Sequence, residues 1–505
     1  MFKEYADYDA LGLAALIASG EVSTSEVLDA ALARAAEMQP MLNAICIPMT
    51  EIARTRAAAP LKGPFAGVPF LIKDIAQDYA GVPTTAGSRA LRNWVPQRHA
   101  EIVERFLRAG LVIFGKTATP EFALKALTET ALFGATRNPW DLERTPGGSS
   151  GGAAAAVAAG IVPIAGASDG GGSIRIPAAY CGLFGLRPSR GRVPPGPSHG
   201  EFWDGASSEH VLSRSVRDSA HMLDALAGAD VGAPFRIAAP ERPFAEELRR
   251  EPGRLRIGFS TRSPIDTPVA PECVAAVEHA ARLLESLGHH VEIAEPKVDG
   301  HALARCFLTM YFGQVAANIA EARAAAGARD TDFELDTRGL GMLGRALSAG
   351  EYVESRRRWN EFSRALGAFH QRYDLLMLPS VAMPPSKIGE LELPAGEQLA
   401  LKLALRLGVG KLLLKSGIID QFAQKSLQRV PFTQLSNLTG TPSMSVPLHY
   451  AAVEAGGPEL PFGVQFVAAH GEEGVLIRLA AQLERAQAWA QRRPQYAGAA
   501  RTRVV

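Results

Sequence analysis

The sequence predicts an α/β protein in which one large domain is built on a parallel sheet. Apolar runs of strand length alternate with helical stretches, and this alternation continues nearly from end to end. No low-complexity linker interrupts it, and no repeat with a period of about 20 to 50 residues is present. The length of 505 residues would by itself allow several domains. The nearly continuous alternation favours one domain.

The first half of the chain begins with helix and then alternates. Residues 1–50 have helical periodicity, and a Gly/Pro break ends this region. Strands are expected at 68–72 and 111–114, with a helix between them at 101–109. Lys73 directly follows the first strand and Lys116 follows the second. Since ligands gather at the carboxyl ends of parallel strands, both lysines lie where a site is expected.

Later elements continue the pattern. Glycine-serine loops at 147–152 and 169–173 bracket a small-residue helix at 153–160 and a strand at 161–167. Beyond them we expect strands at 254–260, 290–294, 375–379 and 462–469, and helices at 271–287 and 475–486.

One segment breaks the alternation. Residues 397–422 interleave leucines with Lys402, Arg406, Lys411 and Lys415, a basic amphipathic pattern that suits a membrane surface or a cover over a pocket. We favour a helical lid packed on the same molecule, with bounds 397–430, because single amphipathic helices usually turn their apolar face to a core.

Composition and charge exclude several function classes. Apolar residues make up 47% and charged residues 21%, which is typical of a globular protein. Lys+Arg 53 against Asp+Glu 52 gives a formal charge of +1, which argues against a nucleic-acid partner. No secretory signal and no membrane-spanning run is visible, so a cytoplasmic protein without stable membrane insertion is expected. The cysteines have no metal-ligand spacing: Cys46, Cys181, Cys273 and Cys306.

The glycine loops are compatible with several kinds of chemistry. Residues 147–152 lack the lysine of a phosphate-binding loop, and neither loop follows a strand in the way a dinucleotide fingerprint requires. Residues 147–151 match the G-x-S-x-G nucleophile elbow, for which His470 is the best-placed histidine. The alternative without chemistry is that these glycines only permit tight turns and close packing.

Two loops that each offer a serine favour catalysis. A serine hydroxyl needs a base, and a desolvated lysine serves where no histidine does. The glycines before Ser173 leave backbone N–H groups unobstructed, as an oxyanion hole requires, so Ser173 is the expected nucleophile and Ser149 the proton relay. Spacing alone does not decide between Lys73 and Lys116 as the base.

These motifs resemble the amidase signature family. The resemblance covers almost the whole chain and is carried by the segments 147–152, 169–178 and 181–189, and by 67–74, 115–122, 138–140 and 462–465. Ser149 and Ser173 are 24 positions apart, as the family's bridging serine and nucleophile are. Two departures are mild: Gly170 stands where the family commonly has a larger residue, and Arg187 where lysine is usual.

The resemblance implies a fold and a site. The fold is a single amidase-signature domain over 1–505, with its signature core at about 62–195 and a central twisted mixed β-sheet covered by helices on both faces. The site is a Ser-cisSer-Lys triad of Ser173, Ser149 and Lys73, with a cis peptide bond after Gly148. It needs no cofactor and no metal. The residues implied around the triad are the backbone N–H groups of Gly170, Gly171, Gly172 and Ser173 as oxyanion hole, Asp169 and Arg175 as braces of the loop, and Lys116 in a structural role.

The implied activity is hydrolysis of a carboxylic amide through an acyl-enzyme on Ser173. Further motifs are most similar to the branch of 6-aminohexanoate cyclic-dimer hydrolases, so the expected partner is a small amide, cyclic or linear. Two alternatives stay open: the glutamine-hydrolysing subunit of an aminoacyl-tRNA amidotransferase, and an α/β-hydrolase-type esterase that uses His470. Whether the chain forms a homodimer is open too.

Overall fold

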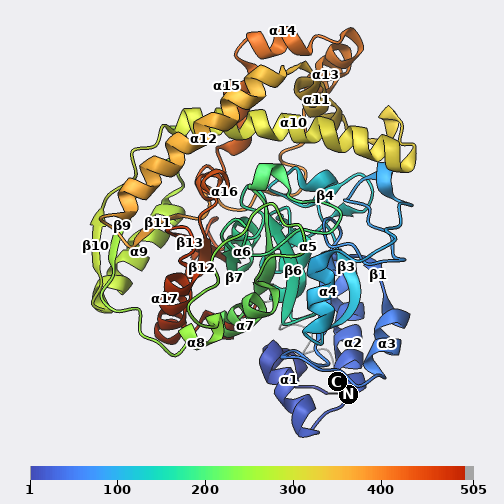
Figure 1. Cartoon of the computed structure of the whole chain (residues 1–505), viewed down its shortest axis with the longest axis vertical. Helices are drawn as coiled ribbons and strands as arrows, with labels where there is room; N and C mark the ends of the chain where they lie inside the picture. Colours follow the sequence, from blue (N-terminus) through green and yellow to red (C-terminus); the bar gives the residue numbers. More distant parts are fainter. Residues whose placement is uncertain (1, 495–505) are drawn as a thin grey trace.

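A mixed sheet of 11 strands forms the centre of the molecule, as the computed structural model, which describes residues 2–494, shows (Figure 1). Its strands are β1 (Ile45–Pro48), β2 (Pro69–Lys73), β3 (Val112–Thr117), β6 (Ile164–Asp169), β7 (Phe184–Arg187), β8 (Ser208–Ser213), β9 (Arg256–Phe259), β10 (His290–Ile293), β11 (Leu375–Pro379), β12 (Ser443–Ala452) and β13 (Glu459–Ala468). A separate hairpin pairs β4 (Glu129–Thr130) with β5 (Gly134–Ala135).

The strand order is β1-β3-β2-β6-β8-β7-β12-β13-β11-β9-β10. Strand β2 runs parallel to β3 and β6, and β9 runs parallel to β10 and β11. The pairs from β6 through β8, β7, β12 and β13 to β11 are antiparallel. The prediction of a parallel sheet is therefore wrong for the middle of the sheet and for the edge pair of β1 and β3. The mixed sheet that the family resemblance implied is confirmed.

Helices cover the sheet and build a layer above it. They are α1 (Ala10–Ser19), α2 (Thr24–Leu42), α3 (Thr50–Ala57), α4 (Glu101–Arg108), α5 (Gly151–Ala158), α6 (Arg175–Cys181), α7 (Val216–Leu226), α8 (Phe244–Glu247), α9 (Pro271–Ser286), α10 (Gly300–Ala326), α11 (Leu335–Ala346), α12 (Ala349–His370), α13 (Ala395–Leu407), α14 (Gly410–Lys415), α15 (Ile418–Leu427), α16 (Gln434–Thr439) and α17 (Glu473–Ala486).

The central strands are buried on both faces. Every residue of β2, β3, β6 and β8 is buried, although successive side chains of a strand point to opposite faces. Both faces are therefore covered, as expected. A second apolar core lies in the upper layer of Figure 1, where α10 packs against α11, α12 and α15.

The expected elements are found with shifted ends, and one is corrected. Residues 1–50 were expected to be helical, but Ile45–Pro48 form β1, which pairs with β3. This run leaves α2 through Asn43 in a left-handed conformation (φ 49°), and its β-branched isoleucines suit the sheet edge. None of the helices among the described residues is long and apolar enough to cross a membrane.

Candidate functional site

Lys73 lies at the carboxyl end of β2 and contacts three serines. Its Nζ donates to Ser149 Oγ at 2.8 Å and to the Oγ atoms of Ser150 and Ser168 at 2.9 Å each. All four side chains are buried. Lys116, one strand further out, instead donates to Thr84 Oγ1 at 2.6 Å. Of the two lysines that spacing left open, Lys73 is the one at the serines.

The surroundings of Lys73 act on its charge in opposite directions. Burial lowers the pKa of Lys73 from its ordinary value to about 7, while the carboxyl groups of Glu209 and Asp169 act in the opposite direction. Gln77 joins the lysine to one of these carboxyls: its Oε1 accepts from the Lys73 N–H and its Nε2 donates to Glu209 Oε2, both at 2.8 Å. A lysine of this kind can accept a proton near neutral pH.

The first glycine loop presents Ser149 through a cis peptide bond between Gly148 and Ser149, as the family resemblance implied. A side chain at 148 would have no space, since a Cβ there would lie 2.5 Å from the Leu127 carbonyl oxygen. Helix α5 begins at Gly151, and a Cβ at Gly152 would lie 2.5 Å from the Ala118 nitrogen. The glycines of this loop therefore allow the close approach that brings Ser149 to Lys73.

Asp169 and Arg175 hold the second loop, and both side chains are fully buried. Arg175 Nε and Nη2 donate to the two carboxylate oxygens of Asp169 at 2.9 and 2.8 Å. Asn437 Nδ2 also donates to Asp169 Oδ1 at 2.9 Å. Burial alone would raise the pKa of Asp169, but the charge and hydrogen bonds of Arg175 hold it well below its usual range. Asp169 and Arg175 thus lie where a bracing role requires them.

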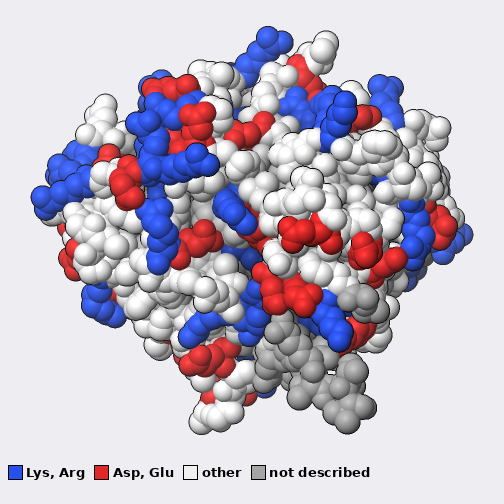
Figure 2. Space-filling view, turned by 90° about the horizontal axis from the view of Figure 1, so that it is seen from below, with Lys and Arg blue, Asp and Glu red and all other residues white. Residues whose placement is uncertain are grey.

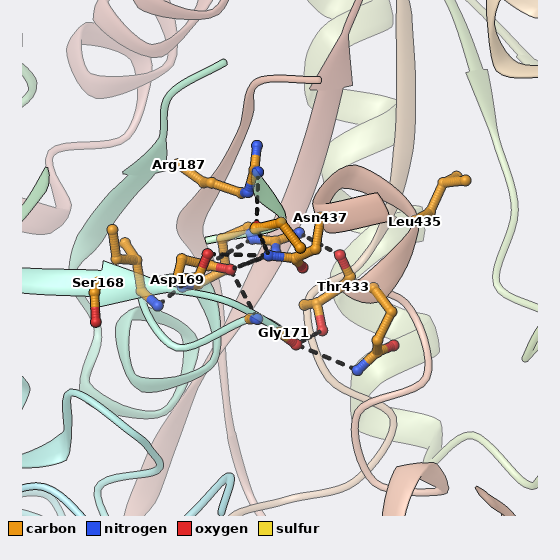
Figure 3. A network of polar contacts seen from close by, with 12 residues as sticks. Ser168, Asp169, Gly171, Arg187, Thr433, Leu435 and Asn437 are labelled. Carbon is orange, nitrogen blue, oxygen red and sulfur yellow. Dashed lines mark hydrogen bonds and ion pairs between the residues drawn. The ribbon is translucent and has the colours of Figure 1, made fainter. Parts of the chain in front are cut away.

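Hydrogen bonds from α16 and the residue before it fix the direction of the loop's peptide groups (Figure 3). The Gly171 carbonyl accepts from Thr433 Oγ1 at 2.6 Å and from Gln434 Nε2 at 3.2 Å. The Gly172 N–H donates to Asp169 Oδ1 at 2.8 Å. The N–H groups of Gly170, Gly171 and Ser173 have no partner in the part of the chain that the structure describes.

Ser149, Ser168, Gly170 and Ser173 line one cavity of about 260 Å³. Its walls are largely apolar and include residues of α10. Gly170, one of the two departures from the family pattern, makes room for Trp203 on this wall, because a Cβ at 170 would lie 2.9 Å from the indole ring. Arg187, the other departure, lies outside the cavity lining and donates to the Thr441 and Ala206 carbonyls at 2.8 and 3.0 Å.

The segment 397–430 supplies no residue to the lining of this cavity. Helices α13 and α14 pack on α11, and α15 packs on α10, so the segment reaches the cavity only through other helices. Its role as a lid stays a prediction. Such a role would require the segment to act on the cavity through α10, which lines it.

His470 does not meet the serines. It follows β13, its side chain is exposed, and the charged groups that act on it are Glu473, Arg190 and Arg187. It is not among the described residues that line the cavity. The alternative of an esterase that uses His470 is therefore wrong, because His470 does not line the cavity that contains Ser149 and Ser173.

Several residues of the site were missed by reasoning from the sequence. Ser168 and Glu209 face each other across β6 and β8, and both line the cavity. Gln77, Thr433 and Asn437 orient the lysine and the second loop. The one available signal was Glu209, a charged residue next to the apolar run Val211-Leu212. Among the described residues, no group of three or more His, Cys, Asp or Glu side chains is arranged to hold a metal ion.

Comparison with known proteins finds amidases that are similar to this chain in sequence and in structure. The family model described as Amidase matches residues 26–477. The 6-aminohexanoate-cyclic-dimer hydrolase of Paenarthrobacter ureafaciens is 37% identical, with 96% of each chain covered. A solved 6-aminohexanoate cyclic dimer hydrolase complexed with substrate superposes with a TM-score of 0.89 at 35% identity, covering 97% of this chain and 99% of that one. For a glutamyl-tRNA(Gln) amidotransferase subunit of Thermotoga maritima the TM-score is 0.69 at 27% identity, covering 92% and 94%.

Proposed function

This chain belongs to the amidase signature family and is an amidase, and from that premise we propose that it cleaves its amide with a Ser-cisSer-Lys triad of Ser173, Ser149 and Lys73. The observation that carries the proposal is the 2.8 Å contact between Lys73 Nζ and Ser149 Oγ. That contact lies beside the cavity lined by Ser173 and is shielded from water. Residues 62–195 contain the whole triad and would be the catalytic core of the single domain.

The chemistry begins at Ser173. Its Oγ attacks the amide carbonyl while its proton passes to Ser149 Oγ, and the proton of Ser149 passes to neutral Lys73. When the tetrahedral intermediate collapses, the C–N bond breaks and the proton returns through Ser149 to the leaving amine. The acyl group stays on Ser173 as an ester. A water molecule, deprotonated along the same route, then releases the carboxylic acid.

The oxyanion of the intermediate needs donors that are free before the reaction. Gly170, Gly171 and Ser173 offer such N–H groups, whereas the N–H of Gly172 is engaged by Asp169. We therefore keep three of the four positions that the sequence suggested as the oxyanion hole and assign Gly172 to the support of the loop. Thr433 and Gln434 favour this arrangement because they fix the Gly171 carbonyl.

The substrate class follows from similarity and from the cavity. The similar cyclic-dimer hydrolases act on 6-aminohexanoate cyclic dimer by name, and cyclic or linear oligoamides of this kind, or other small amides, are the proposed substrates. A largely apolar cavity of about 260 Å³ beside Ser173 suits a small amide with an alkyl body.

Replacing Ser173 by alanine tests the proposal most directly. We expect Ser173→Ala to abolish amide hydrolysis and covalent labelling by a fluorophosphonate, because no other group would carry the acyl intermediate. Mass spectrometry locates the label on the parent enzyme. Ser207→Ala is a matched control, since Ser207 lines the same cavity and has no role in the triad. Labelling that survives in Ser173→Ala would refute the assignment.

A further inference from the structure

The lining of the cavity around Ser173 contains several acidic residues and neither a lysine nor an arginine among the described residues. Among the described residues that line it, Asp78, Glu201, Glu209 and Glu321 carry carboxyl groups, whereas none is a lysine or an arginine. His199 is the one basic side chain, and its Nε2 lies 3.8 Å from Glu321 at the surface. The molecule as a whole is balanced in charge, and Figure 2 shows both signs interspersed on one of its faces. The excess of acidic residues is therefore a property of the cavity and not of the whole molecule.

Glu209 is the deepest of these carboxyls and has an unused oxygen. The residue is 3% exposed, and its Oε2 accepts from Gln77 while its Oε1 has no hydrogen-bond partner in the described structure. Its register partner is Ser168, which contacts Lys73, so Glu209 points to the side of the sheet that bears the serines. Leaving a buried carboxyl oxygen unpaired costs free energy, which a bound donor would recover.

The positive charges near the cavity do not cancel this acidity. Lys73 lies behind Ser149 and Ser168, and burial disfavours its charged form. Arg190 and Arg356 act on Glu201 from a neighbouring hollow, which they line together with it. Glu201 is thus partly compensated, although its Oε2 is also buried without a partner. Among the described residues, no arginine forms an ion pair with Glu209, and the cation that acts on it is Lys73.

The remaining walls suit the body of a cationic substrate. Trp94, Phe122, Phe202 and Trp203 line the cavity and offer flat apolar surface to an alkyl chain. An ammonium group is also attracted to the faces of such rings. The wall therefore accepts a chain that is apolar along its length and positive at one end, and it repels one that ends in a carboxylate.

We propose that this enzyme selects amides that carry a positively charged amine on an alkyl chain, with Glu209 Oε1 as the acceptor for that ammonium group. Amides with an ω-ammonium acyl chain belong to this class, whereas amides whose acyl chain ends in a carboxylate are disfavoured. The selectivity rests on the proposed function, because it concerns the substrates that reach Ser173.

A series of three amides of equal length measures the selectivity. Their acyl chains end in an ammonium, a hydroxyl or a carboxylate group, and the leaving amine is the same. We expect kcat/KM to fall in that order by about tenfold per step, which corresponds to about 1.4 kcal/mol per step. Glu209→Gln should lower the ratio of kcat/KM for the ammonium substrate to kcat/KM for the hydroxyl substrate. Glu361→Gln, a change on the exposed face of α12, leaves it unchanged.

Binding to the inactive Ser173→Ala variant tests the cation selectivity separately from the proposed catalytic triad. Titration calorimetry with n-hexylammonium and with hexanoate needs no turnover, and we expect the ammonium to bind at least about tenfold more tightly. Equal affinities, or tighter binding of hexanoate, would overturn the selectivity, as would hydrolysis of all three amides at one rate. If the parent enzyme cleaved none of the amides but n-hexylammonium still bound more tightly than hexanoate, the cation site would be supported and the catalytic assignment would be refuted.

Discussion

The loop that bears Ser173 and the helices α13–α15 are held in opposite ways. Thr433, Gln434 and Asn437 follow α15 by a few residues and bond the Ser173 loop from a buried position. Helix α13 has no buried residue and exposes Leu399, Leu403 and Leu407 by 69%, 55% and 65%.

This difference teaches where the sequence is constrained. In the Ser173 loop a set of buried charges determines the direction of each peptide group, so one lost partner affects the whole set. In α13–α15, Ala423 and Leu427 belong to the core of the upper layer, whereas Leu399, Leu403, Leu407 and Leu412 are largely exposed. Substitutions should therefore have large effects in the loop and small ones on the exposed side of α13.

Arg175→Met gives the largest expected effect. It leaves the Asp169 carboxylate buried without its cation, which costs roughly 3 to 5 kcal/mol of stability, and it frees the loop that positions Ser173. We expect a large fall in the unfolding temperature and loss of amide hydrolysis, measured by thermal unfolding and by a turnover assay.

Two variants bracket this result. Arg54→Met removes an ion pair with Asp29 whose side chains are about half exposed, and it should cost no more than about 1 kcal/mol. The double variant Asp169→Asn with Arg175→Met should recover part of the stability without the activity, because the Asp169 carboxylate that Arg175→Met leaves unpaired is then absent. A loss for Arg175→Met as small as for Arg54→Met would contradict the comparison.

The pH dependence of kcat gives an effect of intermediate size. Burial lowers the pKa of Lys73 to about 7, so the lysine is protonated and inactive as a base below that pH and neutral above it. We expect kcat on a neutral amide to rise with pH through about 7 and then level off. Glu209→Gln removes a carboxyl that raises the pKa of Lys73, so the rising limb should move to lower pH.

Measurement of kcat from about pH 5 to pH 9 checks this expectation. Ser207→Ala serves as the control, since it alters the same cavity without a change of charge. A rising limb that stays in place in Glu209→Gln, or moves to higher pH, would show that another group is the base.

Much of the site could be predicted from the sequence because its reacting groups lie in contiguous motifs. Lys73, Ser149 and Ser173 are marked by glycines whose missing side chains the loops require. Asn437 could not be found this way, since its contact with Asp169 spans 268 positions and depends on the return of the chain after α15. Ser168 and Glu209 meet only through the register of β6 and β8.

Part of the fold was missed for a related reason. Strand β8 carries Ser, Glu and His residues beside Val211 and Leu212 and shows no alternation of polar and apolar residues. Strand β12 alternates only over the short run from Ser443 to Val446. Strand β8 is buried along its whole length, so burial imposes no period of two on it. Their antiparallel pairing made the middle of the sheet mixed, an outcome that only the family resemblance had implied.

The smallest expected effect comes from the exposed face of α13. The triple change Leu399→Ser, Leu403→Ser and Leu407→Ser should alter stability by no more than about 0.5 kcal/mol per site, because these side chains lose little contact on replacement. We expect kcat/KM on a neutral amide to stay within about twofold.

Leu427→Ser is the matched control: it lies on α15 at 7% exposure within the core of the upper layer and should cost about 2 kcal/mol or more. If the triple variant instead raised KM for every substrate, the segment would act on the cavity through α10, and the contrast between a constrained loop and an independent helical layer would fail.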